Sequence, residues 1–325
     1  MRIIIYGAGG IGCVVGGHLA LAGSDVLLIG RLGQVNAIRE HGLHLIIPGG
    51  THILQIPAVT SPDQIDYKAD DIICLCVKAQ NTEGALRDLQ VATKNVPIFC
   101  FQNGVRNEEV ATQYFSKVYG VMVHVSAVYL TDGEVIAHRD PPGWLTMGCY
   151  PQGTDELVEA VATELRTAGF LVRTTPDVMP YKWGKLMLNL ANVIGAITNI
   201  KPEGINPIVR AAQQEFQDIL TKAGIRWMPE EAQAQEWPET IAPLRGSIDT
   251  EKHSSTWQSL ARNQGTVETE FLNGEVIRLA KKLGKQAPIN ETLLRISLEM
   301  ADNREPPGKY TPAQLCKLLG INYSS

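Results

Sequence analysis

A lysine stands inside an apolar segment in the second half of the sequence. Residues 183–200 are apolar on nearly every face when wound as a helix, which is typical of a helix buried in a bundle. Lys185 lies near the start of this segment, and Asn189 follows four residues later on the same helix face. A buried amine is costly unless it has a partner or a function, and it can supply both a cation and a proton to a group that gains negative charge. The alternative is a lysine whose stem covers apolar surface while its amine reaches water.

A glycine-rich turn near the N-terminus has the spacing that binds a dinucleotide. It follows a strand-like run at residues 3–6 and opens a helical stretch at residues 11–21, the context that the motif requires. Gly7 permits the tight turn, Gly9 lets the backbone approach a pyrophosphate, and Gly12 lets the helix pack closely on the strand. The helix N-terminus attracts phosphates, whereas the alternative is a plain glycine-rich turn. The predicted cofactor-binding residues here are Gly7, Ala8, Gly9, Gly10, Ile11 and Gly12.

The end of the second strand predicts which dinucleotide binds. Sites for NAD usually carry an acidic residue about 20 residues after the glycines, where it bonds the ribose hydroxyls. The strand at residues 25–29 is followed here by Gly30 and Arg31, with no carboxylate. A guanidinium can bind the 2′-phosphate of NADP, which a carboxylate would repel. We therefore expect NADP as the cofactor, the alternative being that Arg31 merely begins a solvated loop.

Polar side chains follow two further strands. Lys78 comes directly after an apolar run at residues 72–77, and Asn103 follows the run at residues 97–101. Ligands of open parallel sheets bind beyond the carboxyl ends of the strands, so both side chains are expected at that edge. Taken singly, Lys78 would be interpreted as a loop lysine and Asn103 with Gly104 as a turn.

The elements that must position these residues differ between the two halves of the chain. In the first half, apolar strands at residues 3–6, 25–29, 72–77, 97–101 and 171–174 alternate with helices at residues 11–21 and 154–168, the latter capped by Thr154. This alternation predicts an α/β fold, a Rossmann-type doubly wound parallel sheet, over residues 1–176. Pro176 and Pro180 then mark the predicted boundary.

The second half lacks this alternation of strands and helices. Helical regions are expected at residues 183–200, 255–283, 293–300 and 312–319. Residues 177–325 are therefore predicted to form an all-helical domain that carries Lys185. Spare apolar surface on such a domain is compatible with a homodimer.

Composition excludes several classes of function. The 325 residues have a formal net charge of −5 and no basic run, which argues against a nucleic-acid partner. No apolar stretch reaches the ~20 residues of a membrane span. The six cysteines show no metal-binding spacing, so no metal site is expected, and a reducing cytoplasm is the predicted compartment.

In these features together, the chain resembles the ketopantoate reductases, or 2-dehydropantoate 2-reductases, from residue 1 to about residue 300. Each motif is modestly specific, but their joint order and spacing are highly specific. The motifs are residues 7–12, Arg31, residues 77–79, residues 102–105, residues 185–189, residues 268–274 and residues 287–291.

The resemblance implies an NADPH-dependent reduction of a small 2-oxo acid and a role for each site residue. Lys185 would be the general acid, and Glu268 would accept a hydrogen bond from a substrate hydroxyl and orient Lys185. Asn103 would bridge cofactor and substrate, and Lys78 would line the nicotinamide end. Asn189 and Ser255 would bind the substrate, Ser255 through the substrate carboxylate.

Several departures from the family pattern concern the substrate. Val193 stands where a second amide is usual, with Asn192 beside it as a substitute from a shifted face. Glu203 falls where another amide is common, and the spacing from Ser255 to Glu268 is one residue longer than usual. Three functions stay open: reduction of 2-dehydropantoate or a related branched 2-oxo acid, the same chemistry on a different 2-oxo acid, and a non-catalytic NADPH-binding sensor.

Overall fold

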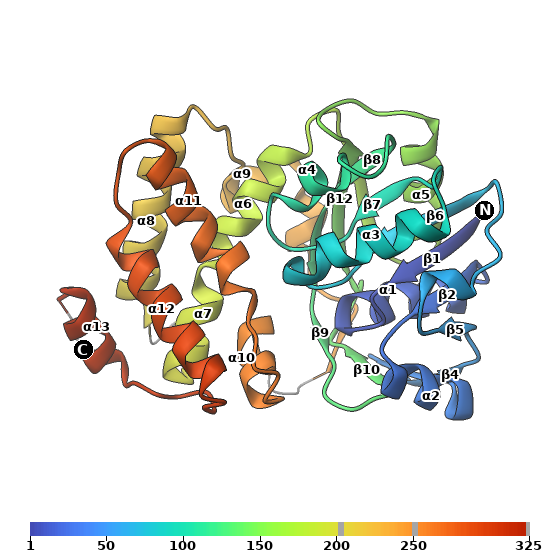
Figure 1. Ribbon diagram of the computed structural model, residues 1–325, viewed down its shortest axis with the longest axis horizontal. Helices are drawn as coiled ribbons and strands as arrows, with labels where there is room; N and C mark the ends of the chain where they lie inside the picture. The colour runs from blue at the N-terminus through green and yellow to red at the C-terminus, as the bar shows by residue number, and fades with distance from the viewer. Residues whose placement is uncertain (201–204, 249–252, 323–325) are drawn as a thin grey trace. The chain divides into compact units, whose positions relative to one another are not determined.

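The computed structural model describes residues 1–200, 205–248 and 253–322, and the chain divides by its contacts into two units (Figure 1). Unit 1 comprises residues 1–182 and 229–252, and unit 2 comprises residues 183–228 and 253–325. With the predicted boundary at residue 176, the chain passes once from the first domain to the second. In the two units defined by contacts, it passes between them three times. Glu203, which the sequence analysis singled out, lies outside the described residues.

An eight-stranded sheet forms the centre of unit 1 and confirms the predicted α/β fold. Neighbouring strands run parallel except at the β8–β12 pair, so β12 and β13 oppose the other strands. The strands lie in the order β13 (Leu171–Thr174), β12 (Gly143–Cys149), β8 (Val118–Val125), β7 (Ile98–Cys100), β6 (Asp71–Leu75), β1 (Arg2–Tyr6), β2 (Asp25–Ile29) and β5 (Ala58–Val59).

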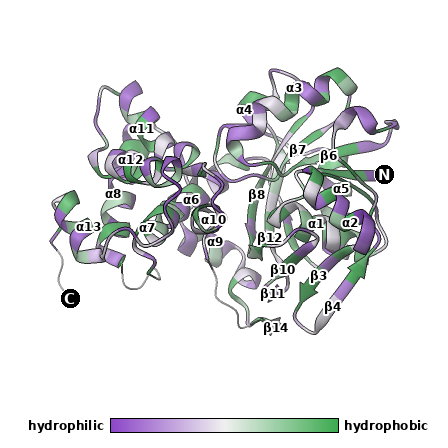
Figure 2. Cartoon of the chain, turned by 60° about the horizontal axis from the view of Figure 1, so that its bottom comes forward, coloured by the Kyte–Doolittle hydropathy of each residue, from purple (hydrophilic) through white to green (hydrophobic). Residues whose placement is uncertain are grey.

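Both faces of this sheet are buried, as its continuous apolar strands predict. Ile3 and Ile5 of β1 belong to one hydrophobic cluster, while Ile4 between them belongs to the cluster of the opposite face. The central strands are largely hydrophobic along their length (Figure 2). The helices of the two clusters are α1 (Gly10–Leu21), α2 (Leu32–His41) and α5 (Glu156–Thr167) on one side, and α3 (Thr82–Ala92) and α4 (Asn107–Ala111) on the other. The short 3₁₀ turn η1 (Pro62–Gln64) lies between β5 and β6, and η2 (Ala79–Asn81) lies between β6 and α3.

Two smaller sheets complete unit 1. The first has the order β4 (Gly50–Leu54), β3 (Leu43–Ile47), β10 (Glu134–Ala137) and β9 (Ala127–Val128). The second pairs β11 (Arg139–Asp140) with β14 (Gly246–Ser247), so a late segment of the chain returns to the first unit. This segment also contains α9 (Glu230–Glu236) and η4 (Pro238–Ile241), and Glu236 binds both Arg173 and Tyr181.

Unit 2 is helical among its described residues, as predicted. Its core contains Ile194, Ile197, Leu293 and Met300. Its elements are α6 (Met179–Asn189), within which the chain enters the unit, α7 (Ala191–Thr198), α8 (Asn206–Ala223), α10 (Ser255–Ala261), η5 (Glu268–Phe271), α11 (Asn273–Lys282), α12 (Pro288–Asp302) and α13 (Pro312–Leu319).

Several predicted boundaries need correction. The helix expected at residues 183–200 is two helices, α6 and α7, that meet at Leu190. The region expected at residues 255–283 is interrupted after α10, where Asn263 and Gly265 have positive φ angles of 55° and 68°. Asp155, not Thr154, caps α5, because its carboxylate accepts a hydrogen bond from the Val158 amide at 2.8 Å.

The long helix α8 was missed. Its apolar residues Ile208, Ala212, Phe216, Ile219 and Leu220 are spaced at helical intervals, and all are buried. Pro at the helix start and Gly224 with φ of 66° at its end are the ordinary signals for its two boundaries.

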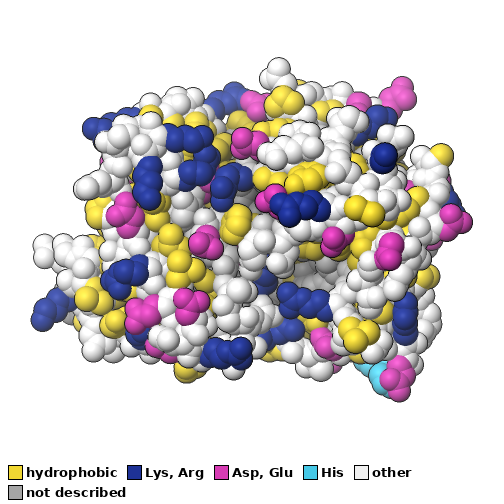
Figure 3. Space-filling view, in the orientation of Figure 1, with side chains coloured by type: hydrophobic (Ala, Val, Ile, Leu, Met, Phe, Trp, Pro, Cys, Tyr) yellow, Lys and Arg dark blue, Asp and Glu magenta, His cyan; other side chains and the backbone are white. Residues whose placement is uncertain are grey.

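Surface properties agree with the balanced composition. Acidic and basic side chains are interspersed with small hydrophobic patches on the face shown in Figure 3. Across the described parts of the chain, no helix combines the length and apolar character needed to cross a membrane.

A buried ion pair ties the beginning of α6 to the core of unit 1. The Lys182 amine bonds the Glu108 carboxylate, and both side chains are almost completely buried, at 2% and 0% exposed. The same amine donates to the Gln102 carbonyl oxygen at 3.2 Å. Because each charge has lost its water, each depends on the other for compensation.

We expect Lys182→Met to lower the free energy of unfolding by about 3–5 kcal/mol, because it leaves the buried Glu108 carboxylate uncompensated. Urea unfolding followed by tryptophan fluorescence measures the loss. The double variant Lys182→Met, Glu108→Leu removes both charges and should recover most of the stability. A single variant as stable as the wild type would show that the pair contributes nothing.

Candidate active site

The glycine-rich turn has the backbone geometry that its sequence predicts. Gly7 has φ of 116°, and a Cβ atom there would lie only 2.6 Å from the Val77 nitrogen. A Cβ atom on Gly12 would overlap the Gly7 carbonyl oxygen. At Gly9, by contrast, a Cβ atom would meet no atom within 4 Å, so the backbone there borders open space. The turn therefore fits a pyrophosphate, because the phosphates can come close to the backbone and bind the N–H groups at the start of α1.

Two cysteines next to this turn, Cys13 and Cys76, add no negative charge to it. Burial raises the pKa of the Cys76 thiol well above its usual value, with neighbouring thiols adding to the shift. Burial likewise raises the pKa of Cys13 to about 12, although the hydrogen bond from Gln34 acts in the opposite direction. Both groups therefore stay neutral near pH 7, and neither repels a phosphate.

Arg31 lies where the sequence analysis expected it, between the end of β2 and the start of α2. It is the N-cap residue of α2, and its side chain is exposed. Its guanidinium forms no ion pair with the residues that the structure describes. An anion at this point would meet both the guanidinium and the positive end of the helix.

Lys78 and Asn103 leave the sheet at the same edge. Strands β6 and β7 are parallel neighbours with Leu75 opposite Cys100, and each polar residue follows its strand end by three positions. Both side chains are half-buried, and both take part in polar interactions. This register starts both loops at the same edge of the sheet, which agrees with the prediction that the two residues lie beyond the carboxyl ends of the strands.

A side-chain network that the sequence analysis missed fixes these two loops. The Gln102 amide donates to the Val77 carbonyl at 2.8 Å and to the Thr82 hydroxyl at 2.7 Å. The Asn107 amide donates to the Asn103 carbonyl at 2.8 Å, while its oxygen accepts from Thr82 at 2.9 Å. The backbone next to Lys78 and that of Asn103 are therefore held by one hydrogen-bonded cluster. Gln102 was visible as the neighbour of Asn103, but nothing in the sequence indicated its partners.

In unit 2, α6 carries Lys185 and Asn189 one turn apart, as predicted. Lys185 is half-buried and Asn189 is 6% exposed, and both take part in polar interactions. Gly184 lets this helix approach the chain at Met228, because a Cβ atom there would overlap the Met228 carbonyl oxygen. The position of Lys185 is therefore set by a close backbone contact at the preceding residue.

Glu268 and Ser255 begin two other elements of unit 2. Glu268 is the first residue of η5 and is only 7% exposed, which is unusual for a carboxylate. Ser255 begins α10, and its buried hydroxyl finds no hydrogen-bond partner among the described residues. Buried polar groups rarely lack a partner, so this hydroxyl is available to a water or to a ligand group.

The start of α10 lies beside α7. Ser254 caps α10 by accepting from the Trp257 amide at 3.2 Å, and its hydroxyl donates to the Asn192 carbonyl at 3.1 Å. Asn192 is thus next to the residue that precedes Ser255. Val193 is 1% exposed and belongs to the core of unit 2, so the missing amide at this position is replaced by apolar packing.

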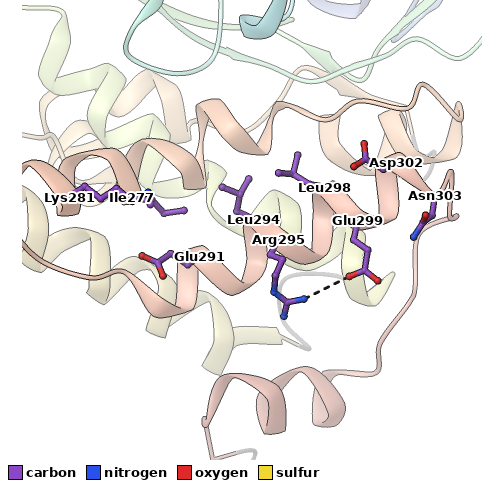
Figure 4. A pocket seen from close by; sticks show the side chains of 9 residues that line it. All are labelled: Ile277, Lys281, Glu291, Leu294, Arg295, Leu298, Glu299, Asp302 and Asn303. Atoms are coloured by element: carbon purple, nitrogen blue, oxygen red, sulfur yellow. Dashed lines mark ion pairs between the residues drawn. The ribbon is translucent and has the colours of Figure 1, made fainter.

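A separate open pocket of about 730 Å³ lies on unit 2 between α11 and α12 (Figure 4). Arg295 and Glu299 form an ion pair of 3.8 Å within it. None of the predicted site residues contributes to it. Its lining residues are Ile277, Lys281, Glu291, Leu294, Arg295, Leu298, Glu299, Asp302 and Asn303.

Known proteins are similar to this chain in sequence and in fold. The family described as ketopantoate reductase PanE/ApbA matches residues 3–152, and its C-terminal counterpart matches residues 177–301. A 2-dehydropantoate 2-reductase of Pyrococcus horikoshii is 33% identical over 303 residues, covering 89% of this chain and 94% of that protein.

Solved structures of related proteins have a similar fold. The PanE/ApbA family ketopantoate reductase from Ralstonia eutropha JMP134 is 28% identical, with a TM-score of 0.78 over 94% of this chain and 99% of that one. A D-mandelate dehydrogenase solved with NADH and anilino(oxo)acetate, at 23% identity, shares the fold with a TM-score of 0.80 over 94% and 99% of the two chains. With two family matches that together span most of its length, this chain belongs to the ketopantoate reductase family and is an oxidoreductase.

Proposed function

We propose that this enzyme reduces a small branched 2-oxo acid, 2-dehydropantoate or a close relative, to the 2-hydroxy acid with NADPH. The observation that carries the proposal is the set of polar side chains that the helical unit buries. Asn189 and Glu268 are 6% and 7% exposed, and the Ser255 hydroxyl is buried without a partner among the described residues. Polar groups in an apolar bundle are costly, so their burial supports a role in binding and catalysis.

The residues divide the chemistry as follows. The bound nicotinamide cofactor supplies the hydride, and the protein supplies position, charge and a proton. A ketone that accepts hydride gains negative charge on its oxygen, and the Lys185 ammonium donates a proton to that oxygen. Glu268 orients Lys185 and accepts a hydrogen bond from a substrate hydroxyl.

Other groups hold the substrate. We assign the substrate carboxylate to the Ser255 hydroxyl, which has an unused donor. Asn189 shares the helix face of Lys185 and binds the substrate beside it, and Asn192, next to the start of α10, is a further amide for the same purpose. The assignment of Asn103 as the bridge between cofactor and substrate is supported by the network that fixes its backbone.

The cofactor is assigned to unit 1. The glycine-rich turn binds the pyrophosphate, Arg31 binds the 2′-phosphate and Lys78 lines the nicotinamide end. The support for NADPH is the exposed guanidinium at the start of α2, at the point where sites for NAD carry an acid.

A second substrate is favoured by one observation. Val193 is buried in the core of unit 2, so it offers no hydrogen bond where the family usually has an amide. A 2-oxo acid with fewer hydroxyl groups loses nothing at such a position. The competing proposal is therefore the same reaction on a more apolar branched 2-oxo acid.

NADPH oxidation with 2-dehydropantoate and with an unhydroxylated branched 2-oxo acid tests the function. We expect turnover with at least one of them, and a decrease in kcat of ~10²–10⁴ in Lys185→Met, because the proton donor is lost. The control Lys282→Met removes an exposed lysine of the same unit and should leave kcat unchanged. Turnover by Lys185→Met at the wild-type rate would rule out Lys185 as the acid, and no turnover of any 2-oxo acid by the wild type would rule out the function.

Cofactor choice is tested by Arg31→Ala. Loss of a charge-assisted contact costs about 1.5–3 kcal/mol, so NADPH should bind about ten- to a hundredfold more weakly, while NADH should be little affected. Fluorescence titration of each cofactor measures both constants. Arg87→Ala, which removes an exposed arginine from α3, is the matched control. An equal loss for both cofactors would contradict the assignment of Arg31 to the 2′-phosphate.

The role of Ser255 is tested by Ser255→Ala against Ser254→Ala. The first should raise KM for the 2-oxo acid about ten- to a hundredfold and leave the free energy of unfolding unchanged, because the hydroxyl has no partner in the described protein to lose. The second removes a helix cap and should cost about 1 kcal/mol of stability. If Ser255→Ala destabilises the protein without changing KM, its hydroxyl is structural.

A further inference from the structure

One segment of unit 1 contacts both parts of the proposed cofactor site. It links β9 to β10 and comprises residues 129–133, which we call the β9–β10 loop. Its first residue lies beside the glycine-rich turn, since a Cβ atom on Gly10 would be 3.6 Å from the Tyr129 Cβ atom. The strand before the loop lies equally close, with the Ala127 Cβ atom 3.4 Å from the same point.

The other end of the loop lies against the first turn of α2. A Cβ atom on Gly33 would overlap a carboxylate oxygen of Asp132, so only glycine leaves room for this contact. The Gly133 amide donates to the side-chain oxygen of Gln34 at 2.6 Å, and Gln34 is 1% exposed. The Tyr129 hydroxyl donates to the other Asp132 oxygen at 2.5 Å. Three contacts, at Gly10, Gly33 and Gln34, therefore hold the loop across the starts of both helices. The bond from Tyr129 to Asp132 lies within the loop.

The loop brings a carboxylate to a place where the sequence showed none. Arg31 caps α2, and Asp132 touches the same helix two residues further on. An acid and a base thus flank one helix start, although the acid comes from a segment about a hundred positions away in the sequence. Asp132 is exposed, so its carboxylate is accessible to a bound ligand.

We propose that Asp132 determines cofactor selectivity: its carboxylate, held against the first turn of α2, opposes the 2′-phosphate of NADPH and so limits the preference that Arg31 creates. A phosphate next to a carboxylate is repelled, whereas the ribose hydroxyls of NADH can donate hydrogen bonds to it. Arg31 and Asp132 then set the balance between the two cofactors with opposite signs. The inference rests on the proposed binding of the adenosine ribose at the start of α2.

The test is direct titration of NADPH and NADH by fluorescence, with no substrate and no turnover. Asp132→Asn keeps the size of the side chain and removes the charge. We expect NADPH to bind about two- to tenfold more tightly. The repulsion between two unit charges a few ångströms apart in a solvated site is about 1 kcal/mol, which corresponds to a factor of this size in the dissociation constant. NADH should bind equally or more weakly. The gain for NADPH should shrink as salt rises from 0.05 to about 0.5 M, because exposed charges are screened.

The matched control is Glu40→Gln, which removes one negative charge from the opposite end of α2, where the Glu40 side chain is 73% exposed. It should change neither constant. Tyr129→Phe removes the hydrogen bond to Asp132 and should shift the ratio of the two constants in the same direction as Asp132→Asn, but less.

The outcomes separate the two proposals. An unchanged ratio of the NADPH and NADH constants in Asp132→Asn overturns the inference, as does an equal change for both, which would make Asp132 a stabiliser of α2 only. If Arg31→Ala weakens NADPH selectively while Asp132→Asn changes nothing, the proposed function survives and this inference fails. If neither variant changes the ratio, the ribose does not bind at the start of α2. Thermal melts of each variant keep loss of folding distinct from loss of binding.

Discussion

The close contact between α1 and β1 is the constraint on which unit 1 depends. The backbone of α1 meets the turn so closely that Gly12 has no room for a Cβ atom, and at Gly16 a Cβ atom would lie 3.0–3.1 Å from Leu28 and Ile5 side chains. Because the backbone of α1 contacts the sheet at these glycines, a shift of the helix along the strands would bring larger residues into the contact. The N-terminus of α1 is therefore fixed at the edge where β1, β6 and β7 end, and the loops that carry the glycine-rich turn, Lys78 and Asn103 begin at that edge.

The α/β class and five strands of the eight-stranded sheet could be predicted from the sequence, because these strands are largely apolar runs. β6, with all five residues buried, is the clearest example. Two errors in helix boundaries occur where local backbone geometry overrides the pattern. Residues 255–283 were expected to form a long helical region, but Asn263 and Gly265 adopt positive φ angles and break it. At α5, two adjacent residues could cap the helix, and only the three-dimensional structure distinguishes Asp155 from Thr154.

The sequence names the candidate site residues, whose roles stay predictions, but it does not indicate the contacts that hold them. Asn103 was identified by its place after a strand, whereas Asn107 and Gln102 fix the loop through bonds to backbone atoms that no sequence pattern specifies. Asp132 shows the same limit for charge. The rule for cofactor choice considers the end of β2 alone, and it cannot detect a carboxylate that another sheet brings to the same helix. Sequence patterns describe neighbours along the chain, and electrostatics depends on neighbours in space.

The return of residues 229–248 to unit 1 has a consequence for how the protein is made. β14 pairs with β11, Arg245 binds Asp140, and Glu236 binds Arg173 and Tyr181. These contacts can form only after the later segment of the chain has been synthesised. At ~5–20 residues per second, a ribosome takes on the order of several seconds to pass from residue 182 to residue 248. During that interval the strand edge of β11 has no partner, and the segment that carries α9 is not yet complete. The order of synthesis thus leaves the edge of β11 unpaired until Gly246–Ser247 has been made, later than every other strand of unit 1.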